Sequence, residues 1–72
     1  MTKPKNVLQQ TRCGSVLRQS DMGKRIGYSV PTIIRFEANP EHMRLDQLCK
    51  WYNAIDAKER PALRKYIMNF FA

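Results

Sequence analysis

Hydrophobic residues recur at helical spacing in the middle of this chain. Met22 and Ile26 are four positions apart, so they share one face of a helix. Ile33 and Phe36 are three positions apart and share the face of a second helix that points back at the first. Residues 19–37 are therefore predicted to form two short helices joined by a tight turn.

The residues between these two helices favour a sharp change of direction. Gly27 supplies the left-handed conformation that commonly ends a helix, and Ser29 is a natural N-cap for the next one. Pro31 falls in the first turn of the second helix, where its missing N–H is least harmful. Gly23 would let a second helix cross closely. A helix, a turn of about four residues with a glycine, and a second helix form the helix-turn-helix arrangement.

An earlier helix is expected from Pro4 to about Arg12 or Cys13, with a break at Gly14-Ser15. The side chains expected to face inward from this helix, or to enter the core after the break, are Val7, Leu8, Thr11, Val16 and Leu17. These residues would place one more layer of apolar contacts against the central pair of helices.

A fourth helix is predicted from about Arg44 to Ala54, after the turn signal Asn39-Pro40. An apolar stripe along it would cover the central helices from behind, and its members are Leu45, Leu48, Tyr52 and Ile55. Trp51 lies next to this stripe. We expect it in the core or in an interface, and the alternative is a platform on which bases stack.

A C-terminal helix is predicted at about 57–71, preceded by Asp56 and Glu59 at capping-box spacing. Its amphipathic stripe is Leu63, Tyr66, Ile67 and Phe70. Each terminal aromatic would contribute about 1.5–3 kcal/mol if buried, which favours a homodimer contact. The residues expected in that interface are Tyr66, Ile67, Phe70 and Phe71. Packing within the monomer is the alternative, and a short strand with Tyr66, Met68 and Phe70 on one side is a further one.

Length and charge limit the functional classes. Seventy-two residues allow a single domain, 1–72, with a thin core. The net charge of +7 favours a polyanionic partner, either nucleic acid or an anionic membrane surface. No apolar run approaches the roughly 20 residues that cross a bilayer, and the first ten residues have no signal-peptide core. We expect a cytoplasmic protein that does not enter membranes.

The residue types needed for metal binding or catalysis are sparse. Cys13 and Cys49 are far apart in the sequence, and His42 is the only histidine. A zinc site needs about four ligands, so no metal and no cofactor are expected. We expect both cysteines to be small, semi-buried residues in a reduced compartment. No Ser/His/Asp or Cys/His set is plausible, so an enzyme is not expected.

The ordered set of residues around the central turn resembles the Cro/repressor (XRE-like) class of helix-turn-helix DNA-binding proteins. The matching features are Gln19, Met22-Gly23 where the family usually has Leu-Ala, Gly27-Tyr28-Ser29, Thr32-Ile33, Arg35-Phe36-Glu37, Asn39-Pro40, Leu45, Leu48 and Ile55. The resemblance covers roughly residues 7–55. It implies an all-α fold, a small five-helix lambda-repressor-like domain with the helix-turn-helix at about 19–37.

The resemblance also implies roles for individual residues. Family members usually pair an arginine late in the first helix with the glutamate that closes the recognition helix, which makes Arg12 and Glu37 the candidate pair here. The alternative is an exposed Arg12. Base contacts are expected from Val30, Pro31, Ile34 and Arg35. Phosphate contacts are expected from Arg18, Gln19, Lys24, Arg25, Ser29, Thr32 and Arg44.

The leading functional hypothesis is a sequence-specific regulator of transcription that binds double-stranded DNA as a homodimer, similar to the Cro-like repressors of phages, prophages and plasmids. The alternative is the DNA-binding antitoxin of a toxin–antitoxin pair, with a toxin protein as a second partner. RNA binding is weaker still, because the chain has no RNP-type aromatic or GxxG signature.

Overall fold

The computed structural model describes the backbone of residues 6–71 and the side chains of residues 6–69. Over this range the chain is all-helical, with no strand, as the sequence predicts. The helices are α1 (Val7–Gly14), α2 (Gln19–Ile26), α3 (Val30–Ala38), α4 (Leu45–Ala54) and α5 (Arg60–Phe71), with 3₁₀ turns at Pro40–His42 and Ala57–Glu59. The backbone of residues 60–71 is helical throughout, which excludes the strand alternative.

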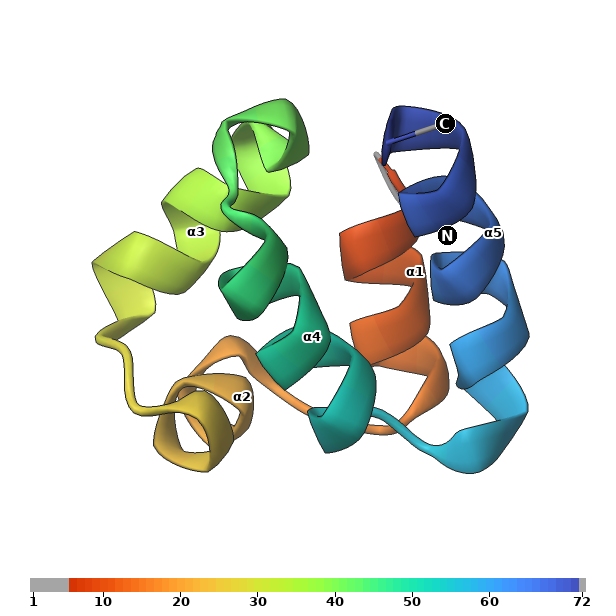
Figure 1. Cartoon of the computed structure of the whole chain (residues 1–72). Coiled ribbons are helices and arrows are strands. Elements are labelled where there is room, and N and C mark those ends of the chain that lie inside the picture. The colour runs from red at the N-terminus through yellow and green to blue at the C-terminus, as the bar shows by residue number, and fades with distance from the viewer. Residues whose placement is uncertain (1–5, 72) are drawn as a thin grey trace.

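The helices form two groups that share one core (Figure 1). α2 packs against α3 and α4, while α1 packs against α5 and α3. α4 lies in the centre and also contacts α5. As a result α3 and α5 lie on opposite sides of the molecule (Figure 1).

The core draws side chains from every helix. Its buried members are Leu8, Leu17, Met22, Ile26, Ile33, Met43, Leu48, Trp51, Ile55 and Leu63. Trp51 is fully buried, which confirms its prediction as a core residue. Its indole N–H donates to Thr11 Oγ1 at 3.3 Å, so the polar atom of the largest core side chain is satisfied and α4 is tied to α1.

Two of the helices begin in the same way. In α2 the backbone N–H of the N-cap residue Arg18 donates to the side chain of Asp21, at 3.0 Å. In α4 the N–H of Arg44 donates to the side chain of Gln47, at 2.9 Å. Each side chain belongs to the third residue of its helix and satisfies a backbone donor that the helix itself leaves free.

Val16 is exposed, and its prediction as a core residue is wrong. It has a φ of +57°, and 86% of its surface is accessible. The N–H of Leu17 bonds to the carbonyl of Arg12 at 3.2 Å, and the N–H of Val16 bonds to the carbonyl of Cys13 at 3.0 Å. This is the Schellman pattern, in which the residue after the cap is left-handed and the next one packs inward. Leu17 therefore takes the buried position and Val16 is turned to solvent.

Leu45 is also exposed, at 49%, so its place in the predicted inward stripe is wrong. It is the first residue of α4, and the core contact at this end comes from Met43 instead. Met43 precedes the N-cap and Leu48 is the fourth helical residue, which is the spacing of a hydrophobic staple. The buried stripe of α4 consists of Leu48 and Trp51 and continues to Ile55.

Several boundaries differ from prediction by a few residues. α1 begins at Val7 behind the N-cap Asn6, and it includes Gly14. Pro4, the expected start, lies outside the described residues. α5 begins at Arg60 after a 3₁₀ turn, and no side chain caps that turn, so the expected capping box is absent.

The two cysteines and the C-terminal aromatics bear on other expectations. Cys13 and Cys49 are both exposed, so the expectation of semi-buried cysteines is wrong. The buried positions of α1 are Leu8, Thr11 and Arg12, and those of α4 are Leu48 and Trp51, so neither cysteine is on the inward side of its helix. The side chains of Phe70 and Phe71 lie outside the described part of the chain, while Tyr66 is half-buried against the core.

Within residues 6–71, no helix combines the length and the apolar character that a membrane span requires. Among the described side chains, no three His, Cys, Asp or Glu residues gather closely enough to hold a metal ion.

Candidate nucleic-acid interface

The turn between α2 and α3 is set by two glycines. Gly27 ends α2 with a φ of +80°, in the left-handed region that was expected of it. The backbone N–H groups of Gly27 and Tyr28 both donate to the carbonyl of Gly23, at 2.8 and 2.9 Å. These two bonds fold the turn back onto the last helical turn of α2. The three residues 27–29 thereby set the direction of α3 relative to α2.

Gly23 is where the turn comes closest to α2. A Cβ built on this glycine would lie 2.5 Å from the carbonyl oxygen of Tyr28, a backbone atom that cannot rotate away. The family that this stretch resembles usually has alanine at the position. In this chain the turn passes so near to α2 that only the hydrogen atom of glycine fits at this position.

Gly23→Ala is expected to lower the free energy of unfolding by about 1–3 kcal/mol, because the turn must move away from α2. This loss would occur although alanine is the better helix former. Urea denaturation followed by circular dichroism measures the change.

Gly14→Ala is the matched control for this substitution. The three heavy atoms nearest to its Cβ would be those of the Glu59 carboxyl group, which can rotate away, so little loss of stability is expected. Equal losses for the two alanine variants would contradict the close approach at Gly23.

The nine-residue helix α3 has a buried inner side and an exposed outer side. Ile33 and Glu37 are buried, and Phe36 is half-buried with its ring edge-on to Tyr28, 5.3 Å between centroids. The four residues predicted to contact bases, Val30, Pro31, Ile34 and Arg35, are all exposed. The alternative in which Ile34 faces the protein is therefore excluded. α3 presents these four side chains together on one accessible surface.

Ser29 occupies the N-cap position of α3, as predicted, but its hydroxyl does not cap the helix. Its Oγ lies 3.0 Å from Oγ1 of Thr32 instead, so the two hydroxyls form a hydrogen bond with each other. The first backbone N–H groups of α3 are left without a side-chain acceptor at this position. Such groups can donate hydrogen bonds to an approaching anion.

Arg35 differs from the other arginines near it. It is exposed, and its guanidinium forms no hydrogen bond or ion pair with any side chain or backbone group of residues 6–69. Arg18 is paired with Asp21 at 3.2 Å, and Arg44 lies 3.5 Å from Asp46. The five donors of Arg35 are thus available for an external acceptor.

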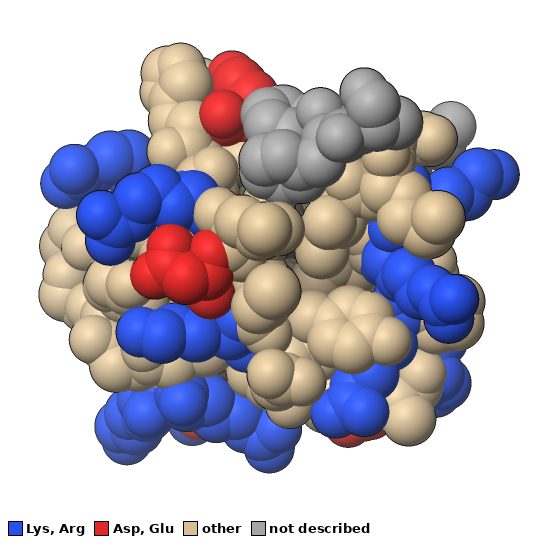
Figure 2. Space-filling model, viewed as in Figure 1, with Lys and Arg blue, Asp and Glu red and all other residues tan. Residues whose placement is uncertain are grey.

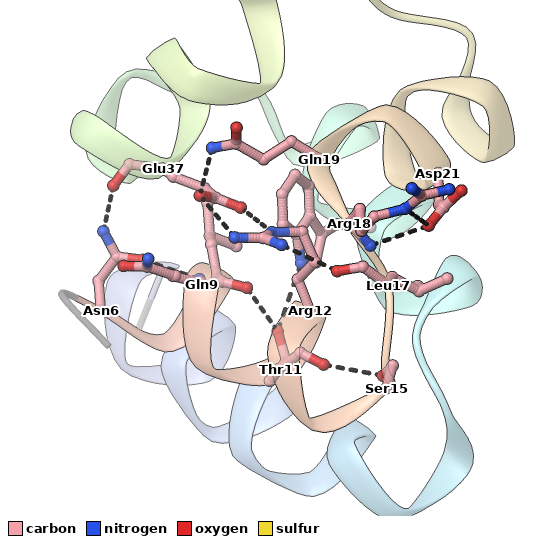
Figure 3. A network of polar contacts seen from close by, with 12 residues as sticks. Asn6, Gln9, Thr11, Arg12, Ser15, Leu17, Arg18, Gln19, Asp21 and Glu37 are labelled. Carbon is pink, nitrogen blue, oxygen red and sulfur yellow. Dashed lines mark hydrogen bonds and ion pairs between the residues drawn. The ribbon is translucent and has the colours of Figure 1, made fainter. Parts of the chain in front are cut away.

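Glu37, at the end of α3, is the centre of a buried polar network (Figure 3). Its carboxylate accepts hydrogen bonds from the guanidinium of Arg12 and, at 3.3 Å, from the side-chain amide of Gln19. Arg12 also donates to the carbonyl of Leu17 at 2.8 Å, and Asn6 donates to the backbone carbonyl of Glu37. The predicted Arg12–Glu37 pair is confirmed and the alternative of an exposed Arg12 is excluded. The network joins α1 and α2 to the C-terminal end of α3.

Gln19, a predicted phosphate contact, is half-buried and directed at Glu37 (Figure 3). Beside it, the backbone N–H of Arg18 and then the Arg18 side chain bond to the carboxylate of Asp21, which lowers the pKa of Asp21 below its usual value. The N-terminal end of α2 therefore already holds one negative charge, supplied by the protein.

The remaining predicted phosphate contacts lie on different parts of the surface. Lys24 is exposed on α2. Arg25 donates to the carbonyl of Ala54 at 2.8 Å and lines a groove between α2 and α4 with Lys50. Arg35 is not among the residues that line this groove.

A second cavity adjoins the C-terminal part of α3, with a volume of about 330 Å³. Its lining residues are Arg35, Phe36, Asn39, His42, Arg44 and Gln47. It brings together Arg35 and Arg44, which were predicted as base and phosphate contacts. Asn39, His42 and Gln47 were not predicted as part of this surface. They could have been found from the sequence, because they lie in the loop after the second central helix or in the first turn of the helix that follows.

Basic side chains are spread widely. Figure 2 shows Lys and Arg along the left, lower and right margins of the face in view, over the regions of α3, α2 and α5. Charge alone therefore does not single out the α3 side. What distinguishes α3 is an exposed row of side chains on a helix that is anchored from behind. The assignment of a function rests on these residues and their geometry, because comparisons with protein-family models, curated proteins and solved structures found no match.

Proposed function

We propose that this chain is a sequence-specific regulator that binds double-stranded DNA. In this proposal α2, the turn and α3 form a helix-turn-helix of the lambda-repressor-like class, and α3 enters the major groove. One observation carries the proposal: α3 exposes Arg35 with an unengaged guanidinium, while Ile33 and Glu37 anchor its inner side. The major groove is wide enough to accept one α-helix in this way.

Arg35 supplies the polar base contact. A guanidinium can bond the O6 and N7 atoms of guanine at the same time, which is the commonest specific contact in the major groove. No neighbouring carboxylate competes for its donors among the described residues. Guanine is therefore the base that we assign to Arg35.

Contacts to phosphate would hold α3 in register without specifying sequence. The residues that we assign to this role are Arg18, Gln19, Lys24, Arg25, Ser29, Thr32 and Arg44. The N-terminal end of α3, which no side chain caps, would add to them, since a helix N-terminus favours an anion. Gln19 would exchange its bond with Glu37 for a phosphate oxygen.

We further propose that the chain acts as a homodimer and represses transcription by occupying a promoter, as a Cro-like repressor would. The dimer contact would run through Tyr66 and Ile67 of α5 with Phe70 and Phe71. α5 lies on the side of the molecule opposite to α3 (Figure 1). In such a dimer each protomer would place its α3 at one of two half-sites related by two-fold symmetry.

Selection of bound duplexes from a random DNA pool, followed by sequencing, tests the proposal. The expected result is one enriched motif made of two half-sites related by two-fold symmetry. A motif with a single half-site would overturn the dimer while keeping DNA recognition. No enrichment over the starting pool would overturn the function itself.

Arg35→Ala is expected to weaken binding to the selected duplex by about 1–3 kcal/mol and to abolish the preference at one base pair. The loss follows from removing the bidentate contact to guanine. Binding titrations on duplexes that differ at single positions measure both effects. Lys24→Ala is the control, since a phosphate contact should weaken binding to all sequences equally. An unchanged base preference in Arg35→Ala would exclude Arg35 as a base contact.

A further inference from the structure

Two large apolar side chains stand exposed on the outer side of α3, in the middle of a strongly basic protein. Ile34 is 49% exposed and Val30 is 36% exposed. They are four positions apart, so they lie one above the other on the same face of the helix. The inner side of α3 is already filled by Ile33, which is fully buried. Val30 and Ile34 are therefore not part of the hydrophobic core.

Few hydrogen-bonding groups accompany them. Pro31 has no N–H to donate, and the hydroxyls of Ser29 and Thr32 are bonded to each other at 3.0 Å. Arg35, next to Ile34 in the chain, is the one charged side chain on this side of α3 whose donors are unengaged among the described residues. The outer side of α3 thus carries a short apolar strip with the guanidinium of Arg35 beside it, and Ile34 also lines a groove with Gln9 and Gln19.

We propose that Val30 and Ile34 recognise the C5-methyl groups of thymine, so that this chain distinguishes T·A base pairs by apolar contact beside the guanine contact of Arg35. The inference rests on the proposed DNA-binding function. Thymine is the only one of the four bases that places a methyl group in the major groove, and apolar side chains recognise it by contact.

The charge around the strip selects DNA over a protein partner as its occupant. The chain carries a net charge of +7, and an unpaired guanidinium adjoins the strip. A second copy packed symmetrically on this strip would bring its own Arg35 close to the Arg35 of the first. The edge of a duplex offers methyl groups within a polyanion, which matches both features of the surface.

The test uses the tightest duplex selected by the wild-type chain from a random pool. Each thymine in it is replaced singly by uracil, which removes the methyl group and keeps every hydrogen-bonding atom. At one or two thymines in each half-site the dissociation constant is expected to rise about fourfold, the value of one buried methyl group. Uracil at the other thymines should leave it unchanged.

Two variants assign each methyl group to its residue. In Ile34→Ala, uracil should no longer matter at the thymine that Ile34 contacts, while the effect at the other thymine persists. Val30→Ala should give the reverse pattern. Both positions are exposed, so the variants should fold, and thermal unfolding verifies this. Arg35→Ala should bind more weakly but retain both uracil effects.

Two results would overturn the inference while the proposed function stands. One is a wild-type chain that binds every uracil duplex as tightly as the thymine duplex. The other is a uracil effect that persists undiminished in Ile34→Ala and Val30→Ala. Failure to select any duplex is a different result, since it removes the proposed function and this inference together.

Discussion

Glu37→Ala is expected to lower the free energy of unfolding by about 3–5 kcal/mol, because it leaves the buried guanidinium of Arg12 without its counter-charge. Both side chains are more than nine-tenths buried. Gln19 loses its acceptor as well. The free energy of unfolding of a 72-residue domain is only a few kcal/mol in total, so circular dichroism should show this variant largely unfolded at 37 °C.

The double variant Arg12→Met with Glu37→Leu separates the cost of an unpaired charge from the worth of the pair. Replacing both charged partners by apolar residues of similar size removes the uncompensated charge, so most of the loss should be recovered. A double variant as unstable as Glu37→Ala would show that the pair itself holds α1 to α3. A Glu37→Ala protein as stable as the parent would contradict the network altogether.

The central part of the fold could be predicted because its signals are local. Gly27 is left-handed where a helix end was expected, and Ser29 precedes the next helix. Apolar spacing gave the five helices, with ends displaced by a few residues. The ion pair of Arg12 with Glu37 could not come from spacing, since 25 residues separate them. It came from the resemblance to the Cro/repressor class.

The starts of α2 and α4 agree with the prediction to within one residue, but the hydrogen bonds that cap them at Arg18 and Arg44 could not be predicted in this way. Arginine is not among the residues preferred at an N-cap, because its side chain has no acceptor. In both helices the bond runs the other way, from the N-cap backbone to a side chain three residues later. Val16 was misplaced for a related reason. A valine with positive φ is uncommon enough that the pattern predicts a buried residue instead.

For the candidate site, the sequence indicates which residues face outward but not which of them form no hydrogen bond or ion pair with the rest of the protein. Arg18, Arg35 and Arg44 are equivalent in type. Their difference arises from Asp21 and Asp46, whose carboxylates lie near the first and the last of them. Gln19 shows the same limit, since its bond to Glu37 spans 18 residues. The free guanidinium of Arg35 is thus a property of the folded chain.

Trp51→Ala is expected to lower the free energy of unfolding by about 3–5 kcal/mol, as for other large-to-small changes of a buried aromatic. Trp51 has no accessible surface, and its N–H bonds to Thr11 across the α1–α4 contact. The cavity would lie between the two groups of helices, which leaves little to hold α1 and α5 against α4. Urea denaturation followed by far-ultraviolet circular dichroism measures the loss.

Two further variants of α4 show whether the loss of stability in Trp51→Ala comes from the buried ring. Trp51→Phe keeps most of the volume and removes the N–H donor, while the hydroxyl of Thr11 keeps its bond to the carbonyl of Val7, so a cost of about 0.5–1.5 kcal/mol is expected. Leu45→Ala, on the exposed side of α4, should change stability by no more than about 0.5 kcal/mol. Equal losses from Trp51→Ala and Leu45→Ala would mean that α4 does not turn its tryptophan inward. The packing of α1 and α5 against α2 to α4 would then need another explanation.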